Sequence, residues 1–304
     1  MDGKISNLCQ IASLRRYVLC DGAERGLEVI DCNNGTLRFL INVSKACDIM
    51  QLYHRGENVS FVTKNGFTGR EIPFLNRFEG GMVYTCGLDS VGGREGYELH
   101  GTLHNTPAKI VRAQCDEQGI CVEAEIRDTA LFGKNLVLKR RISSKRGSEH
   151  LTIEDTLVNE GYADEPYCLL YHVNVGYPML DEGVKIVANA RQITPRTEWA
   201  KENIATVYEM QNAQAEREET CYFLELAEPT VSVLNEKTGK VFTLAYSAQT
   251  LPHFVEWKSE ASGDYALGLE PCTTELDERF AYKTLQPREE VNFKLDLSVK
   301  NLNE

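Results

Sequence analysis

The chain has 304 residues, 42% of them hydrophobic, and a formal net charge of −12 at pH 7. This length and composition allow a sizeable buried core, whereas the negative charge and the scattered basic residues argue against a nucleic-acid partner. No apolar run reaches the roughly 18 residues that cross a bilayer and the first ten residues lack an apolar signal core, so we expect a cytoplasmic protein without a membrane partner.

Most apolar segments alternate with polar residues at a period of two and end at Gly, Asn, Asp or Pro, a pattern that predicts strands. In chain order they cover residues 27–42, 120–128, 136–144, 150–159, 230–247 and 291–299. The Asn34-Gly35 pair and the turn from Lys237 to Gly239 each predict a β-hairpin. Only residues 202–219 are rich in helix formers, and their mixed charge fits a helix and a solvated loop or short helix equally well.

No Pro/Ser/Gly-rich linker, internal repeat or low-complexity segment divides the sequence. We therefore expect one domain over residues 1–304, of the all-β class with few short helices. An antiparallel sheet that buries one face needs a second layer, so the many strands predict two large antiparallel sheets packed as a β-sandwich. A ligand site is then expected on a concave sheet face or among the end loops.

The ten cysteines contain no CxxC pair, which argues against a zinc knuckle or a redox motif. A disulfide framework is typical of small secreted chains, whereas a large chain without a signal sequence can carry buried thiols as small apolar residues. We expect reduced cysteines.

Glycine is dense in residues 76–107, a segment that also holds Arg77, His100 and His104. Glycine-rich irregular segments in β proteins are places where sites are built. The two histidines would share a face in a strand, so a two-histidine metal site is conceivable, but no third ligand follows at a readable spacing. Histidines bonded within a loop remain an alternative, and substrate binding is the favoured interpretation.

A single histidine, His172, stands in the otherwise apolar or amide run 167–180. In a strand over residues 168–175, His172 and Asn174 share one face with Cys168 and Leu170, so that face becomes polar at its far end. On pattern alone, a core histidine bonded to a backbone carbonyl is the favoured interpretation.

Glu270 follows an apolar strand and precedes a proline in residues 264–274. Burial would raise the pKa of its carboxyl toward the range of a useful base, although glutamates at strand ends are more often solvated or ion-paired. The sequence contains no GxSxG, GxxxxGK[ST], GxGxxG or HExxH motif, which removes support for hydrolase and nucleotide-binding interpretations.

Three segments together resemble the aldose 1-epimerase-like proteins of the galactose mutarotase superfamily: "ELHGTLHNTPAKIV", "IEDTLVNEGYADEPYCLLYHVNVGYPMLDEG" and "YALGLEPCTT". The resemblance covers the chain from about Leu27 to Val299 and is nearest to a branch described as a domain of unknown function. It implies a large galactose mutarotase-like β-sandwich with a sugar site on its concave face and no metal or organic cofactor.

The resemblance also implies residue roles. The sugar-binding histidine of an "HG" motif falls on His100, the general acid on His172 and the general base on Glu270. An arginine after asparagine matches Arg77, although the superfamily's early motif is not reproduced as a whole and its substrate-binding aspartate is not identified. We expect Arg77, His100, His104 and Asn174 to bind substrate.

Anomer interconversion needs a base for the proton of the C1 hydroxyl and an acid for the ring oxygen. We expect an ionised Glu270 and a protonated His172 at opposite edges of one hexose-sized hollow, with pKa values close to neutrality. Trp257 could stack on a sugar ring or belong to the core.

Two other functions stay open: a sugar-binding protein without catalysis, and an isomerase or lyase that acts on a keto sugar or uronate. The expected partner is a small sugar or sugar acid, and the sequence leaves the sugar, its anomer and the oligomeric state undetermined.

Overall fold

The computed structural model describes residues 3–302, whose regular structure is dominated by two antiparallel sheets. The smaller sheet has five strands that lie in chain order. They are β1 (Ser13–Val18), β2 (Glu28–Asn33), β3 (Leu37–Asn42), β4 (Asp48–His54) and β5 (Glu57–Asn58). The predicted all-β class with two large antiparallel sheets is confirmed.

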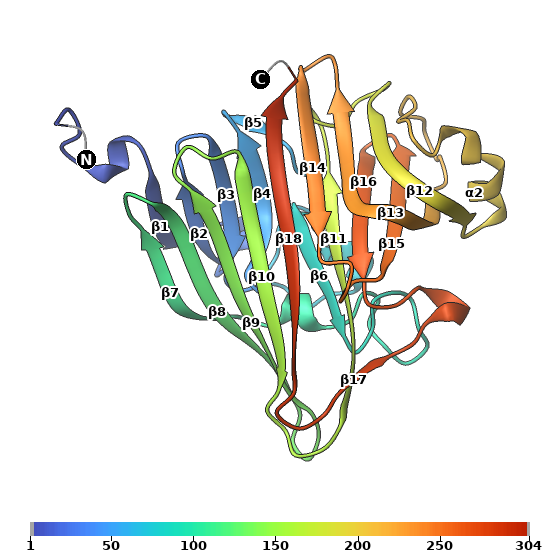
Figure 1. Cartoon of the computed structure of the whole chain (residues 1–304), viewed down its shortest axis with the longest axis horizontal. Coiled ribbons are helices and arrows are strands. Elements are labelled where there is room, and N and C mark those ends of the chain that lie inside the picture. The colour runs from blue at the N-terminus through green and yellow to red at the C-terminus, as the bar shows by residue number, and fades with distance from the viewer. Residues whose placement is uncertain (1–2, 303–304) are drawn as a thin grey trace.

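The larger sheet has 13 strands, and its order departs from the order of the chain (Figure 1). The hydrogen-bonded path runs β17-β11-β16-β15-β13-β14-β18-β10-β9-β8-β7, with β12 on β13 and β6 on β11. The strands are β6 (Val83–Leu88), β7 (Lys109–Cys115), β8 (Gly119–Thr129), β9 (Asn135–Lys145), β10 (His150–Asn159), β11 (Glu165–Val175), β12 (Lys185–Pro195), β13 (Thr220–Asn235), β14 (Lys240–Tyr246), β15 (His253–Ala261), β16 (Asp264–Cys272), β17 (Lys283–Leu285) and β18 (Glu290–Asn301).

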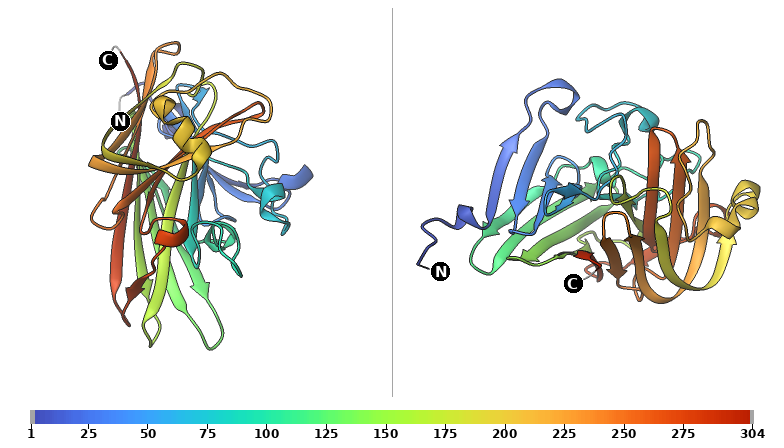
Figure 2. Two further views of the ribbon diagram at one scale, coloured as in Figure 1. Left: turned by 90° about the vertical axis from the view of Figure 1, so that its right-hand side faces the viewer. Right: turned by 90° about the horizontal axis from the view of Figure 1, so that it is seen from above.

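The main core fills the space between the sheets. In β8, Ile120, Val122, Ala124 and Ile126 are buried and alternate with less buried neighbours, as the period of two predicts. Burial of each Ile or Val side chain contributes about 1.5 to 3 kcal/mol. Seen from above, the blue strands of the small sheet face the green strands of the large sheet (Figure 2, right).

Both predicted hairpins are present. Strands β2 and β3 pair from Asn33 and Arg38 onward, and Gly35 in their turn has a φ of 98°. Strands β13 and β14 pair from Asn235 and Lys240, with Gly239 at a φ of 67°. Glycine suits these turns because other residues rarely adopt positive φ.

The helices are short and lie outside the sheets. They are α1 (Phe74–Arg77) and α2 (Glu198–Glu202), with 3-10 turns η1 (Leu8–Gln10), η2 (Gly22–Glu24), η3 (Leu103–Asn105), η4 (Ile204–Thr206) and η5 (Asp277–Arg279). Within residues 3–302, no helix combines the length and apolar character needed to cross a bilayer.

Residues 202–219 form no long helix, so the alternative of a loop with short helical turns holds. Helix α2 ends at Glu202, and only the turn η4 follows before β13 begins. The charges of this segment serve tertiary contacts instead of helical pairs: Arg217 pairs with Glu260 on β15 at 2.8 Å. Tertiary pairing has overridden the helix propensity here.

Strand β11 separates the main core from a second, smaller cluster. Leu169, Tyr171 and Val173 face the main core, whereas Cys168 and Leu170 pack in a cluster with residues of β6, β13, β15 and β16. His172 follows the alternation of the second set. The predicted division of this strand into two faces is therefore confirmed, and both faces are buried.

Candidate functional site

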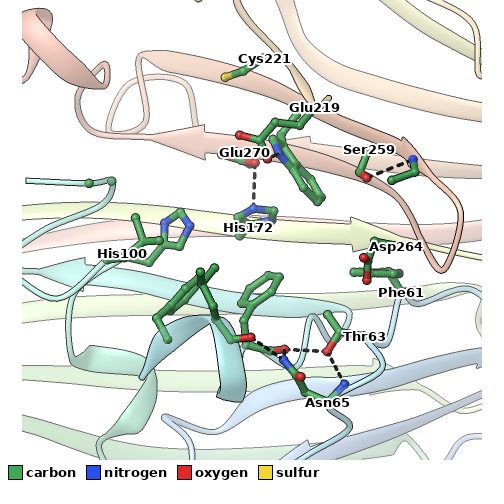
Figure 3. A pocket seen from close by; sticks show the side chains of 18 of the residues that line it. Phe61, Thr63, Asn65, His100, His172, Glu219, Cys221, Ser259, Asp264 and Glu270 are labelled. Carbon is green, nitrogen blue, oxygen red and sulfur yellow. Dashed lines mark hydrogen bonds and ion pairs between the residues drawn. The ribbon is translucent and has the colours of Figure 1, made fainter. Parts of the chain in front are cut away.

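A cavity of about 580 Å³ lies beside the smaller cluster, on the face of the large sheet turned away from the main core (Figure 3). This volume is within the range of small-molecule sites. Its floor carries His172 from β11, Cys221 from β13, Trp257 from β15 and Glu270 from β16. Its apolar wall consists of Phe61, Phe74, Leu75, Phe78, Leu99 and Leu276.

His172 and Glu270 lie side by side at the bottom of this cavity. Nε2 of His172 is 3.1 Å from Oε1 of Glu270, and the two residues are 4% and 3% exposed. The pairing of β11 with β16 brings them together, because Asn174 stands opposite Gly268 and Val173 opposite Leu269. The expectation of opposite edges is wrong: adjacent antiparallel strands place both groups at one point of the floor.

Burial shifts the two pKa values in opposite directions. It lowers the pKa of His172 to about 3, with a further contribution from the nearby His100. It raises the pKa of Glu270 to about 8, where Glu219 adds to the effect and Arg196 opposes it. Both shifts follow from the cost of a charge in an apolar surrounding.

Burial therefore favours a neutral imidazole and a protonated carboxyl at neutral pH, the reverse of the expected assignment. The proton of Glu270 lies within reach of Nε2, so the pair carries one exchangeable proton between about pH 3 and about pH 8.

His100 reaches the cavity from the loop after β6. Its Nδ1 is 2.9 Å from the carbonyl oxygen of Val91, and burial lowers its pKa. The ring is therefore neutral, Nδ1–H donates to the carbonyl, and Nε2 remains an acceptor for a ligand hydroxyl. His100 has a φ of 64°, and its ring centroid is 5.6 Å from that of His172.

Trp257 lies on the floor of the cavity and not in the main core. Its ring centroid is 5.5 Å from that of His172, and its Nε1 donates to Oε2 of Glu219 at 2.7 Å. The indole is thus held in one orientation by a carboxylate.

Several charged residues that line the cavity were not predicted from the sequence to belong to a site. Glu219, Arg196 and Arg217 come from segments around β12 and the start of β13, and Lys64 and Asp264 pair at 2.7 Å on its rim. From sequence alone, charged residues in a segment of mixed charge are expected to face water. In the structure, residues 196–219 fold against β15, and this brings their charged side chains to the cavity.

Three predicted substrate-binding residues lie outside the cavity lining: Arg77, Asn174 and His104. Arg77, in α1, is turned to Glu98 with 2.6 Å between Nη2 and Oε1. Asn174 is fully buried on β11 beyond His172. Their expected contact with substrate is not supported by these positions.

His104 belongs to a buried charge network outside the cavity lining. Its Nδ1 is 2.6 Å from Asp48 and its Nε2 is 3.2 Å from Glu79, while its ring stacks on Tyr84. Although burial favours the neutral ring, these two carboxylates raise its pKa. His100 and His104 thus face different partners because residues 103–105 form a turn and not a strand. Across residues 3–302, no three His, Cys, Asp or Glu side chains form a group suited to a metal ion.

Comparison with known proteins gives the family and the fold. The model of a family described as "Domain of unknown function (DUF4432)" matches residues 24–299. A search of curated proteins found no match.

Solved structures similar to this chain include a "putative aldose 1-epimerase" from Klebsiella pneumoniae, with a TM-score of 0.87 and 20% identity over 98% of this chain and 87% of that one. A galactose mutarotase-like protein from Clostridium acetobutylicum has a TM-score of 0.71 and 14% identity, over 96% of this chain and 99% of that one. A galactose mutarotase-like protein from Lactobacillus casei has a TM-score of 0.64 and 13% identity, over 90% and 100%. The galactose mutarotase-like β-sandwich is therefore confirmed.

Proposed function

This chain belongs to the family described as Domain of unknown function (DUF4432), and we propose that it interconverts the anomers of a free sugar by acid/base opening and closing of the ring. The observation that carries the proposal is the 3.1 Å contact between Nε2 of His172 and Oε1 of Glu270 on the floor of a cavity. The mutarotase-like fold supports it.

Ring opening requires the shared proton on His172. Glu270, ionised, accepts the proton of the C1 hydroxyl, while Nε2–H of His172 donates to the ring oxygen. The bond between C1 and the ring oxygen breaks, and its electron pair stays on that oxygen as it gains the proton. An aldehyde forms at C1, and the pair is left as protonated Glu270 and neutral His172.

Ring closure uses the protonation state that burial favours. After rotation about C1–C2, His172 accepts the proton of the attacking hydroxyl, and Glu270 returns its proton to the former carbonyl oxygen. The pair ends as it began, and the other anomer leaves. Since burial favours a protonated Glu270 beside a neutral His172, the pair is set for closure of an open-chain sugar.

The remaining lining residues fit an uncharged sugar better than a sugar acid. Each cation that lines the described cavity has an acidic partner: Lys64 with Asp264, Arg196 with Asp277, and Arg217 with Glu260. An anionic substituent would have to displace one of these carboxylates. His100 would accept a hydrogen bond from a hydroxyl, and Trp257 would pack against a ring face.

A second candidate reaction is favoured by the basicity of Glu270. A carboxylate with a pKa of about 8 could also remove a carbon-bound proton next to the carbonyl of a keto sugar or uronate. This isomerase or lyase would use the same pair. It differs in incorporating solvent hydrogen at a carbon atom.

The test is exchange NMR on a panel of free aldoses and uronates with the wild type, His172→Asn and Glu270→Gln. We expect the wild type to accelerate anomer exchange and both variants to lose that acceleration while keeping their folded spectra. Glu256→Gln is the matched control, since Glu256 is also a buried carboxyl with a raised pKa but does not line the cavity.

Equal rates in the wild type and in both variants would refute the proposed acid/base pair. Sugar binding without acceleration would identify the alternative of a non-catalytic sugar-binding protein. Deuterium appearing on a ring carbon in heavy water would favour the isomerase or lyase.

A further inference from the structure

Asn174 is a buried polar residue two positions after His172 on the same face of β11. It is 0% exposed and does not line the cavity. Its backbone is fixed on both sides, since its N–H donates to the carbonyl of Met82 and its carbonyl accepts from the N–H of Phe61. A buried amide of this kind is costly unless its hydrogen-bonding groups are used.

The orientation of the Asn174 amide follows from its one hydrogen bond. Nδ2 donates to the backbone carbonyl of His172 at 3.0 Å. Because a carbonyl oxygen can only accept, the NH₂ group must face it, and Oδ1 must point the other way. The side chain therefore presents an acceptor on the side away from that carbonyl.

Two buried polar atoms close to each other in the chain are left without hydrogen-bond partners in the described structure: Oδ1 of Asn174 and Nδ1 of His172. They are complementary, because an amide oxygen accepts and an imidazole N–H donates. The Asn174 side chain also acts on the ring as a hydrogen-bonding group that favours its protonated form. Nδ1 is turned toward the part of the sheet that holds Asn174, because a β-carbon added at Gly268, which stands opposite Asn174, would lie 3.2 Å from Nδ1.

We infer that Asn174 is a positioning residue that accepts Nδ1–H of His172 and thereby keeps Nε2 free to exchange a proton with Glu270 and the substrate. This inference rests on the proposed function. In the opposite tautomer, Nε2 would carry the proton in the resting state, and Nδ1 would present a lone pair to the lone pairs of Oδ1. Asn174 thus selects the tautomer in which Nε2 can accept the proton of Glu270.

The charged and titratable groups around His172 could also influence its pKa, and a pH test of Asn174 has to take them into account. Glu270 faces it from β16, His100 from the loop after β6, and Tyr84 stands opposite it on β6. Glu219 and Arg196 act on Glu270 and not directly on the ring. Nδ1 has no hydrogen-bond partner within residues 3–302, so a change at Asn174 should act on the His172–Glu270 pair through the imidazole.

The first measurement is the tautomer itself, from the ¹⁵N shifts of His172 in the wild-type protein at neutral pH. We expect the proton on Nδ1. A proton on Nε2 would overturn the inference, and because no substrate is needed, the result is independent of whether the protein is a mutarotase.

The second measurement compares Asn174→Leu with Asn174→Asp in anomer exchange over a range of pH. Loss of the acceptor in N174L should lower kcat about 10-fold with KM little changed, since a hydrogen bond worth about 1.4 kcal/mol is lost from the imidazolium. The fall in kcat at acidic pH, which reports the pKa of His172, should move to lower pH in N174L because an acceptor for the imidazolium is lost. In N174D it should move to higher pH because a carboxylate would face Nδ1. A purely structural role would not give shifts of opposite sign.

Asn42→Leu is the matched control. Asn42 is 0% exposed on β3, both of its side-chain polar atoms lack a hydrogen-bond partner in the described structure, and it does not line the cavity. Its replacement should leave the pH profile unchanged. Unshifted profiles in both Asn174 variants would refute the inference, whereas wild-type rates in His172→Asn and Glu270→Gln would refute the proposed function.

Discussion

Gly268 lies directly against the ring of His172: a β-carbon added at Gly268 would stand 2.8 Å from Cε1 of His172. It would also stand 2.6 Å from Oε1 of Glu270. Real β-carbons essentially never approach other atoms so closely, so any side chain here must push the pair apart. Glycine at this position makes the contact between Nε2 of His172 and Oε1 of Glu270 geometrically feasible.

We therefore expect Gly268→Ala to lower the rate of anomer exchange about 100-fold, because a displacement of catalytic groups by about 1 Å has an effect of that size. Gly69→Ala is the control, since its added β-carbon would meet only ordinary contacts, the nearest at 3.6 Å. Exchange NMR and thermal unfolding of both variants make the comparison. A G268A protein with wild-type activity would mean that the close approach of His172 and Glu270 is not required.

Glu219 and Arg196 should shift the pH profile in opposite directions. Glu219 raises the pKa of Glu270 and Arg196 lowers it. The pair loses its one proton above the higher pKa, so Glu219→Gln should move the high-pH limb to lower pH, and Arg196→Gln should move it to higher pH. E219Q should also raise the plateau rate, because a weaker base leaves the shared proton on His172 more often. The measurement is kcat against pH for the three proteins, and shifts of one sign in both variants would contradict it.

Arg140 belongs to the same buried charge network as His104, because both contact Asp48, and its replacement should lower the stability of the protein. Arg140 is 2% exposed and bonds Asp155 through Nε and Nη2 and Asp48 through Nη1. Arg140→Met would leave Asp155 and Asp48 buried without the guanidinium that pairs with both, so we expect a loss of about 3 to 5 kcal/mol in the free energy of unfolding. Denaturant titration measures it.

The adjacent Arg141 is the control for that experiment. Its Nη1 pairs with Glu154 at 2.6 Å, but the two side chains are 48% and 46% exposed. Arg141→Met should change stability by less than about 1 kcal/mol. Similar losses in the two variants would show that the network does not depend on its burial.

Glu256 should make the protein less stable as pH rises. Its carboxyl is 0% exposed, and burial raises its pKa from 4.5 to about 8, against the influence of Lys258. A group whose pKa is higher in the folded state gives its full contribution below its unfolded pKa and loses it as pH rises through the folded pKa. This loss is expected between about pH 4.5 and about pH 8.

Glu256→Gln should therefore be more stable than the wild type at about pH 9 and change stability much less at about pH 4. Glu270 adds the same dependence, so the single variant should remove only part of the slope, and the double variant with Glu270→Gln should remove more. Urea unfolding at the two pH values tests both statements. Equal slopes in the wild type and E256Q would contradict them.

Local sequence was sufficient for the strands but not for the contacts between distant strands. The alternation in β8 and the positive φ angles of Gly35 and Gly239 depend only on neighbouring residues in the chain, so local sequence could predict them. The same reasoning was wrong about the spacing of His172 and Glu270. The register of β11 on β16 joins segments far apart in the chain, and no local pattern encodes that register.

Interpretations of charged residues depended most on tertiary structure. His104 and Arg77 carry the residue types of a sugar site, yet they pair with acidic residues outside the cavity lining. Glu219 and Arg196 carried no signal, yet they line the cavity. The sequence does not indicate whether a polar side chain will bind water or another side chain, because its partner can come from a distant part of the chain.

By itself, the sequence determined an all-β sandwich, its two hairpins and the candidacy of His172 and Glu270, because hydrophobic alternation, turn residues and motifs are local properties. Only the tertiary structure decided that these two groups touch, that Glu270 is the more basic of them, and that Asn174 is buried outside the cavity lining. Those outcomes depend on strand register and on the exclusion of water by neighbouring layers, and both arise only when the whole sheet is assembled.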